Sequence, residues 1–169
     1  MKNLVRAGLM SAVMVVLMCG GVFAQSSFSA QGGAMVNGLI FGRSGSYVQN
    51  TSLDITNVTN EVVHCKVTFY DHDGIDITHL AKVYTGSAGS RTIVLATGTA
   101  EYDIPAHSTR CFQLDSGIDG SYRYCSAEIL WSSEDKKPHK ALIGTARNSG
   151  GTGTSLYYGN YPINNGQPF

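Results

Sequence analysis

The chain has 169 residues, and its 12 basic and 12 acidic side chains give a formal net charge of zero at pH 7. Charged residues make up 14% of the sequence and are scattered, with no cluster of Lys and Arg. We therefore expect no nucleic acid and no anionic membrane surface as a partner, because both are recognised through concentrated positive charge.

Residues 1–24 have the parts of a cleavable secretory signal peptide in the expected order. Lys2 and Arg6 precede an apolar run, and the run ends in a small-residue cleavage signal at Ala24. The run is shorter than the roughly 20 apolar residues that a membrane-spanning helix needs. We therefore expect cleavage before Gln25, no integral membrane span afterwards, and a secreted or periplasmic protein, with the cell surface as one destination.

Beyond the signal, strand-like patterns separated by turn residues replace helical periodicity. Residues 25–49 are expected to be an N-terminal extension that contains a first strand. The clearest half-buried strand is at residues 63–70, where every second residue from Val63 to Phe69 is apolar or Cys. Further strands are predicted over residues 53–58, 75–84, 92–95, 100–104, 109–114, 122–131 and 140–146.

This spacing of short strands and turns predicts an all-β fold, a single antiparallel β-sandwich with its core over residues 50–147. The alternative is a small eight-stranded β-barrel. The closing strand of such a barrel alternates apolar and polar residues over about ten positions. Pro162, Pro168 and the Asn-Asn-Gly at residues 164–166 interrupt any such alternation at the end of the chain.

Two short motifs resemble those of a known group of exported proteins. V-x-F-Y-D-x-D-G at residues 67–74 leads an aromatic strand into an Asp/Gly turn, and I-P-A-x-S at residues 104–108 opens a later strand with a Pro-centred turn. Both resemble small bacterial exported immunoglobulin-like or fibronectin-like β-sandwich proteins. The resemblance implies an immunoglobulin-like sandwich and implies no activity.

Three cysteines follow the signal peptide, and an exported protein is expected to bond two of them. If the loop at residues 115–120 closes a hairpin, Cys111 and Cys125 lie directly opposite each other, at a Cα separation that suits a disulfide. The alternative joins Cys65 to Cys125 between two sheets, by analogy with immunoglobulin domains. We favour the first pairing, which leaves Cys65 as a buried free thiol.

Asp71, Asp73 and Asp76 have the alternating spacing of a calcium-binding loop around Gly74, so calcium is the one cofactor that the sequence suggests. The twelfth position of such a loop needs a glutamate, and Lys82 stands there instead. Asp and Gly are also the preferred residues of tight turns. A turn without metal is therefore the favoured interpretation.

The Gly/Asn/Tyr-rich segment 148–169 is expected to form one edge strand at residues 155–158 and otherwise a loose tail. It contains Tyr157, Tyr158 and Tyr161, whose flat amphipathic rings suit carbohydrates and protein partners. The alternative is that these tyrosines are ordinary strand residues, because tyrosine is common in strands.

The sequence contains no GxSxG, HExxH, CxxC or phosphate-binding loop, so no catalytic motif is present. We therefore predict that the protein is not an enzyme. The expected function is that of a non-catalytic exported β-sandwich protein that acts in binding or assembly at the cell surface or in the periplasm. Two alternatives stay open: a calcium-dependent carbohydrate-binding or adhesion module, and a small secreted hydrolase whose site has no recognised motif.

A protein partner or self-association is expected, because an open sandwich leaves unpaired backbone groups at its strand edges. Residues 25–41 could supply an extended segment to the edge of a neighbouring copy. The favoured alternative is that these residues form the first strand of their own domain.

Overall fold

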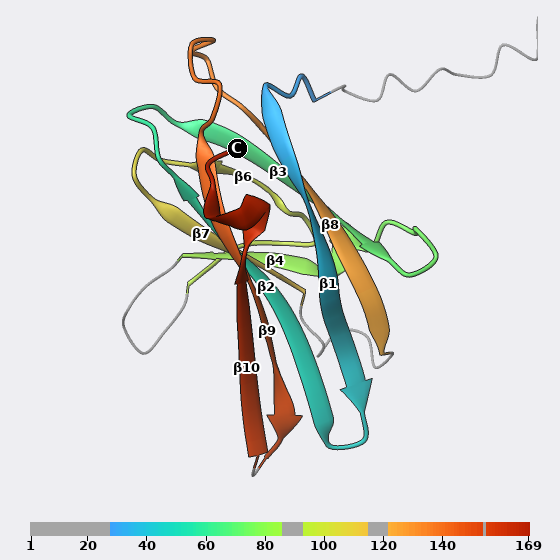
Figure 1. Cartoon of the computed structure of the whole chain (residues 1–169). Coiled ribbons are helices and arrows are strands. Elements are labelled where there is room, and N and C mark those ends of the chain that lie inside the picture. The colour runs from blue at the N-terminus through green and yellow to red at the C-terminus, as the bar shows by residue number, and fades with distance from the viewer. Residues whose placement is uncertain (1–27, 86–92, 115–121, 154) are drawn as a thin grey trace, which may run out of the picture.

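The computed structural model describes residues 28–85, 93–114, 122–153 and 155–169, most of which belong to antiparallel β-structure (Figure 1). The predicted signal peptide lies outside these residues. Within the described ranges, no helix is long and apolar enough to cross a membrane. The elements are β1 (Gly32–Ser44), β2 (Tyr47–Asn57), β3 (Val63–Asp71), η2 (Thr78–Leu80), β4 (Ala81–Thr85), β5 (Val94–Thr97), β6 (Glu101–Ile104), β7 (Thr109–Leu114), β8 (Arg123–Ser132), β9 (Leu142–Thr152), β10 (Ser155–Pro162) and η3 (Ile163–Gly166).

Two sheets enclose the core. One has the strand order β6-β3-β8-β1, and the other has the order β5-β4-β7-β2-β9-β10. Strand β1 belongs to both, because residues 32–41 pair with β8 and residues 42–44 pair with β2. The predicted all-β antiparallel fold is confirmed. The continuous path from β5 through β1 to β6 also brings the structure close to the eight-stranded alternative, with a sheet that nearly closes on itself.

The core is formed by strands whose alternate residues point inward. On β3, the inward set from Val63 to Phe69 is fully buried, as the alternation predicts. On β8, every second residue from Cys125 to Trp131 is buried as well. Trp131 packs against Gly32, where an added Cβ atom would lie 2.7 Å from the indole nitrogen. A residue without a side chain is therefore needed where β1 crosses the tryptophan.

Strand β1 is an intrinsic strand of this domain, which confirms the favoured interpretation of the N-terminal segment. A register shift in its pairing with β8 occurs around Gly38, which has a φ of 74°. The Tyr161 hydroxyl donates a hydrogen bond of 2.7 Å to the carbonyl of Asn37, and the Asn148 side-chain amide donates one of 3.0 Å to the carbonyl of Gly38. These bonds fasten the irregular part of β1 to β9 and β10.

The predicted hairpin between residues 109–114 and 122–131 does not form. Strand β7 pairs with β2 and β4, whereas β8 pairs with β1 and β3, so consecutive strands lie in different sheets. The predicted loop at residues 115–120 lies outside the described residues. Because Cys111 and Cys125 are not opposed, the predicted disulfide between them is wrong, and both are free buried thiols.

The alternative disulfide between Cys65 and Cys125 is also wrong. The two residues lie on neighbouring strands of one sheet, where Cys65 is opposite Trp131 and Cys125 is opposite Asp71. The separation along the strands is roughly 20 Å, far beyond the reach of a disulfide. Cys65 is a buried free thiol, as expected. Burial raises the pKa of all three thiols, to about 12 for Cys111 and about 11 for Cys125.

The C-terminal segment forms strands, and the expected loose tail is wrong. Residues 148–152 continue β9, and β10 contains the predicted edge strand at residues 155–158. At the end of the chain, Phe169 is buried, and its backbone exchanges hydrogen bonds with Leu142. Pairing to β9 therefore orders a segment whose composition is typical of loops.

Candidate functional site

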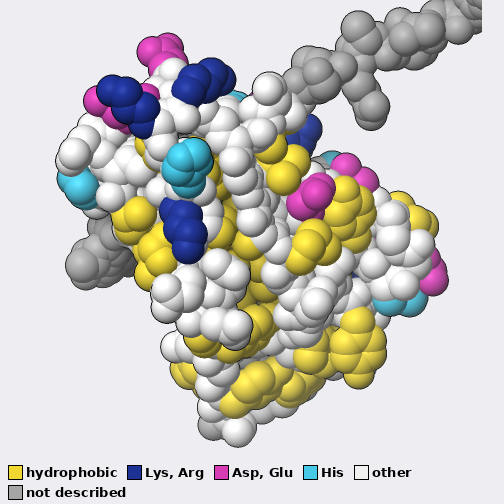
Figure 2. Space-filling view, turned by 45° about the horizontal axis from the view of Figure 1, so that its top comes forward, with side chains coloured by type: hydrophobic (Ala, Val, Ile, Leu, Met, Phe, Trp, Pro, Cys, Tyr) yellow, Lys and Arg dark blue, Asp and Glu magenta, His cyan; other side chains and the backbone are white. Residues whose placement is uncertain are grey.

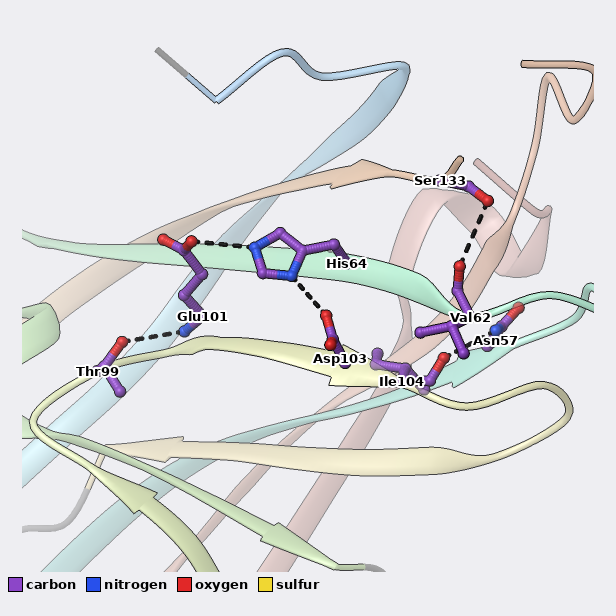
Figure 3. Close-up of polar contacts among 8 residues, drawn as sticks. All are labelled: Asn57, Val62, His64, Thr99, Glu101, Asp103, Ile104 and Ser133. Atoms are coloured by element: carbon purple, nitrogen blue, oxygen red, sulfur yellow. Dashed lines mark hydrogen bonds and ion pairs between the residues drawn. The ribbon is translucent and has the colours of Figure 1, made fainter. Parts of the chain in front are cut away.

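A cluster of charged side chains surrounds His64 on the outer face of β3. Its Nδ1 lies 2.6 Å from an Asp103 carboxylate oxygen, and its Nε2 lies 3.0 Å from a Glu101 carboxylate oxygen (Figure 3). Both carboxylates come from β6, whose residue Asp103 is paired directly with His64. The imidazole ring also stacks on Phe28, with 5.5 Å between ring centroids. The imidazole of His64 is therefore held on three sides, by Asp103, Glu101 and Phe28.

The surroundings of His64 favour its protonated form. Partial desolvation lowers the pKa of His64, but the hydrogen bonds and negative charges of Asp103 and Glu101 outweigh it, so the net shift is upward. An imidazolium donates from both ring nitrogens, which matches two carboxylate acceptors. The group is thus an ion cluster that joins β3 to β6.

Beside this cluster lies a hollow of about 430 Å³ lined by Ser29, Val62, His64, Asp103, Ser132, Ser133, Glu134 and Lys136. Serine, histidine and carboxylate are the groups of a hydrolase triad. However, both nitrogens of His64 are occupied by carboxylates, and the Ser133 hydroxyl donates to the Val62 carbonyl (Figure 3). Among the described residues, no serine is hydrogen-bonded to His64, so the hollow contains no paired nucleophile and base.

The signal for the His64 cluster is present in the sequence as complementary charge. His64 and Lys66 alternate on the outer face of β3, and Glu101 and Asp103 alternate in the same way on β6. Antiparallel pairing places His64 opposite Asp103 and Lys66 opposite Glu101. The sequence does not show that these two strands pair, so it does not reveal that the four residues are neighbours.

The three aspartates of the predicted calcium loop act as turn residues. One oxygen of Asp71 accepts hydrogen bonds of 3.0 Å from the backbone amides of Asp73 and Ile75, and these bonds lower the pKa of Asp71. Asp76 accepts one of 2.8 Å from the amide of Thr78. The described residues contain no group of three or more His, Cys, Asp or Glu side chains able to hold a metal ion. Asp71 and Asp76 thus stabilise the turn through bonds to backbone amides.

The three predicted binding tyrosines lie on β10 but do not form one patch. Tyr161 is half-buried, and its hydroxyl is used by the bond to β1. Tyr157 and Tyr158 are successive strand residues and therefore point to opposite faces of the sheet. Tyr157 stacks on Tyr47, with 6.3 Å between ring centroids and 21° between ring planes. Desolvation and the hydrogen bond with Tyr47 raise the pKa of Tyr157.

Gly150 makes room for the Tyr157 ring on the neighbouring strand. The two residues are paired across β9 and β10, and an added Cβ atom on Gly150 would lie 2.8 Å from the tyrosine hydroxyl. The same atom would lie 2.9 Å from the backbone oxygen of Val48. The run of glycines in β9, which suggested a loop in the sequence, therefore shapes the surface beside β10.

Strand β10 is an exposed sheet edge. Within the described residues it pairs with β9 alone, so one row of its backbone N–H and C=O groups is open. Leu156 and Tyr158 are each 68% exposed, and Tyr157 is 41% exposed. A hollow of about 240 Å³ lies beside Leu156 and Tyr158, and its other lining residues are Val48, Asn50, Ser149, Gly150 and Gly151.

The end of the molecule that contains β10 is apolar at its surface. Figure 2 shows hydrophobic side chains gathered toward the lower end of the view, the end where the β1–β2 and β9–β10 hairpins lie in Figure 1. Acidic and basic side chains gather instead on the upper part and along the right side of Figure 2. The strand edge and the apolar surface therefore coincide.

Comparison with known proteins gives no functional information. No protein-family model matches the chain, and no curated protein matches it. A crystal structure of Thermotoga maritima 1070 is similar over 80% of this chain and 95% of that chain, with 14% sequence identity and a TM-score of 0.49.

Proposed function

We propose that this chain is a non-catalytic exported protein that acts in binding or assembly, and that its binding element is the open edge of β10. One observation supports this most directly: an eight-residue edge strand contains no charged residue and exposes Leu156, Tyr157 and Tyr158. Proteins that stay monomeric protect such edges with charge, bulges or short strands. An edge left long, uncharged and aromatic is suited to pairing with another strand.

The two alternative functions have less support. A hydrolase needs a nucleophile in contact with a base, and His64 has both ring nitrogens on carboxylates. A calcium-dependent carbohydrate module needs the turn carboxylates as ligands, and Asp71 and Asp76 are engaged with backbone amides. Strand pairing through β10 uses groups that the fold leaves open.

Site-specific photocrosslinking in the producing cell tests the proposed function. A photoreactive amino acid replaces Tyr158, and the matched control replaces Ile75, an apolar residue 60% exposed in the turn after β3. We expect irradiation to give a discrete protein adduct from position 158 and none from position 75. Absence of an adduct from position 158 would overturn the proposal, and so would equal labelling from both positions, which would indicate unspecific contact.

A further inference from the structure

We propose that the strand that pairs with β10 belongs to a second copy of this chain, so that two β10 strands join antiparallel about a two-fold axis centred on Tyr158. This inference rests on the proposed function, because it names the partner of the same strand edge. A two-fold interface uses the same surface twice and must be complementary to itself. The residues of β10 meet that condition in charge, in side-chain pairing and in length.

Charge is the first condition. When a strand pairs with its own copy, a charged residue at the axis faces an identical charge, and a charged residue elsewhere is desolvated unless the position opposite has the opposite charge. The sequence of β10, Ser-Leu-Tyr-Tyr-Gly-Asn-Tyr-Pro, contains no Asp, Glu, Lys, Arg or His. Self-pairing of this edge therefore costs no ionic desolvation and brings no like charges together.

Backbone geometry selects the centre of the pairing. Only two residues separate the paired Thr152 and Ser155, so the backbone groups of Ser155 face β9. Strand alternation then turns the backbone groups of every second residue, Leu156, Tyr158 and Asn160, toward the open edge. A two-fold axis at Tyr158 matches these three residues with the same three on the second copy.

The same register pairs side chains favourably. Tyr158 meets Tyr158 of the second copy, and directly opposed aromatic residues stabilise a sheet. Tyr157 lies opposite Gly159 of the second copy, while its ring lies over Gly150 and stacks on Tyr47 of its own copy. Gly159 has open space around it, since an added Cβ atom would meet nothing within 4 Å. Positions 157 and 159 can therefore pair across the interface without a clash between side chains.

Pro162 limits the length of the interface. Proline has no backbone N–H and cannot extend the ladder, so the pairing centred on Tyr158 covers residues 155–161 in both copies. Because each copy uses its own β10 and the axis closes the pair, the product is a dimer rather than a fibre.

Cysteine crosslinking of the purified protein tests both the partner and the register. Tyr158→Cys alone is expected to form a covalent dimer under mild oxidation, because directly opposed residues have Cα atoms about 5.5 Å apart. Leu156→Cys and Asn160→Cys are expected to link to each other when the two variants are mixed, and neither is expected to link to itself. Ile75→Cys is the exposed control and is expected to stay monomeric. The three cysteines among the described residues, Cys65, Cys111 and Cys125, are buried.

The outcomes separate this inference from the proposed function. Dimers of Tyr158→Cys and of the mixed variants, together with a concentration-dependent dimer of the unmodified protein in sedimentation, support it. Self-linking of Leu156→Cys would overturn the register. A protein that stays monomeric and gives no Tyr158→Cys dimer would overturn the second copy as partner; the proposed function then stands if cellular crosslinking from position 158 captures another protein, and fails if it captures none.

Discussion

The edge strands β6 and β10 differ in length, in charge and in the apolar side chains that they expose. Strand β6 has four residues, and two of them, Glu101 and Asp103, have carboxylates bound to His64 on the neighbouring strand. Strand β10 has eight residues, no charge and three exposed apolar or aromatic side chains. Short length and charge are the usual means by which a protein prevents its edges from pairing. The edge at β6 is therefore protected, and the edge at β10 is left open.

This comparison shows that the open edge at β10 is a local feature. The protein has charged residues available for edges, since β6 contains two in four positions. On β10, Tyr157 instead lies opposite Gly150 of β9 and stacks on Tyr47 of β2. These contacts order an aromatic side chain at the surface. Four predictions test or refine the difference between the two edges, from the largest expected effect to the smallest.

The largest effect is expected at the glycine beside β10. Gly150→Val places a branched side chain against the Tyr157 ring and the Val48 carbonyl oxygen, contacts that a Cβ atom alone would already make at 2.8–2.9 Å. We expect a loss of up to about 3 kcal/mol in the free energy of unfolding, measured by denaturant titration. Gly159→Val is the matched control on β10, where space is open. Equal losses for both variants would contradict the role of Gly150.

Adding charge to β10 is expected to give this strand the protection that β6 has. Tyr158→Lys places two like charges face to face at the two-fold axis and removes the central aromatic residue. We expect self-association to weaken by about 2 kcal/mol, roughly 30-fold, in sedimentation equilibrium. Tyr158→Phe should retain association, because the ring is kept. Unchanged dimerisation of the lysine variant would place the interface elsewhere.

Removing charge from β6 is expected to alter the histidine that it binds. Asp103→Asn eliminates the carboxylate 2.6 Å from His64 Nδ1, so the pKa of His64 should fall. An NMR titration of the imidazole resonances measures this directly. Asp73→Asn, in the turn after β3, is the control and should leave the His64 titration unchanged. A His64 pKa that does not move would show that Asp103 is not its principal partner.

The smallest effect is expected in the pH dependence of stability. The pKa of His64 is raised in the folded state, so its stabilising contribution is complete below the unfolded pKa and is lost as pH rises through the folded value. The stability difference between the wild type and His64→Gln should therefore be larger at pH 5.5 than at pH 8.5. Because the side chain is 41% exposed, we expect less than about 1 kcal/mol. A difference that grows with pH would contradict the ion cluster.

Local patterns in the sequence predicted the parts of the fold that depend on neighbouring residues. The alternation from Val63 to Phe69 identified β3 and its buried face. The spacing of Asp71 and Gly74 identified the turn that follows, and the residues around 155–158 identified an edge strand. Each of these follows from side-chain alternation or from turn chemistry, which act over a few residues.

Pairing between distant strands was beyond the reach of these patterns. The hairpin rule placed Cys111 opposite Cys125 because they are close in sequence, but β7 and β8 lie in different sheets. The carboxylate partners of His64 come from β6, and Asp103 is 39 residues away from His64 along the chain. The pairing of strands depends on how the apolar faces of all strands pack into one core. No short segment of the sequence contains that information.

The sequence by itself determined that the described chain is an antiparallel β-protein, which residues of β3 point inward, and that Tyr157 and Tyr158 lie on an edge strand. Only the tertiary structure decided that β10 has one partner and an open edge, that Tyr161 is bound to β1, and that the cysteines are apart. The physical reason is the range of the forces involved. Side-chain alternation is set residue by residue, whereas the exposure of a strand edge depends on which other strands of the whole chain pair with it.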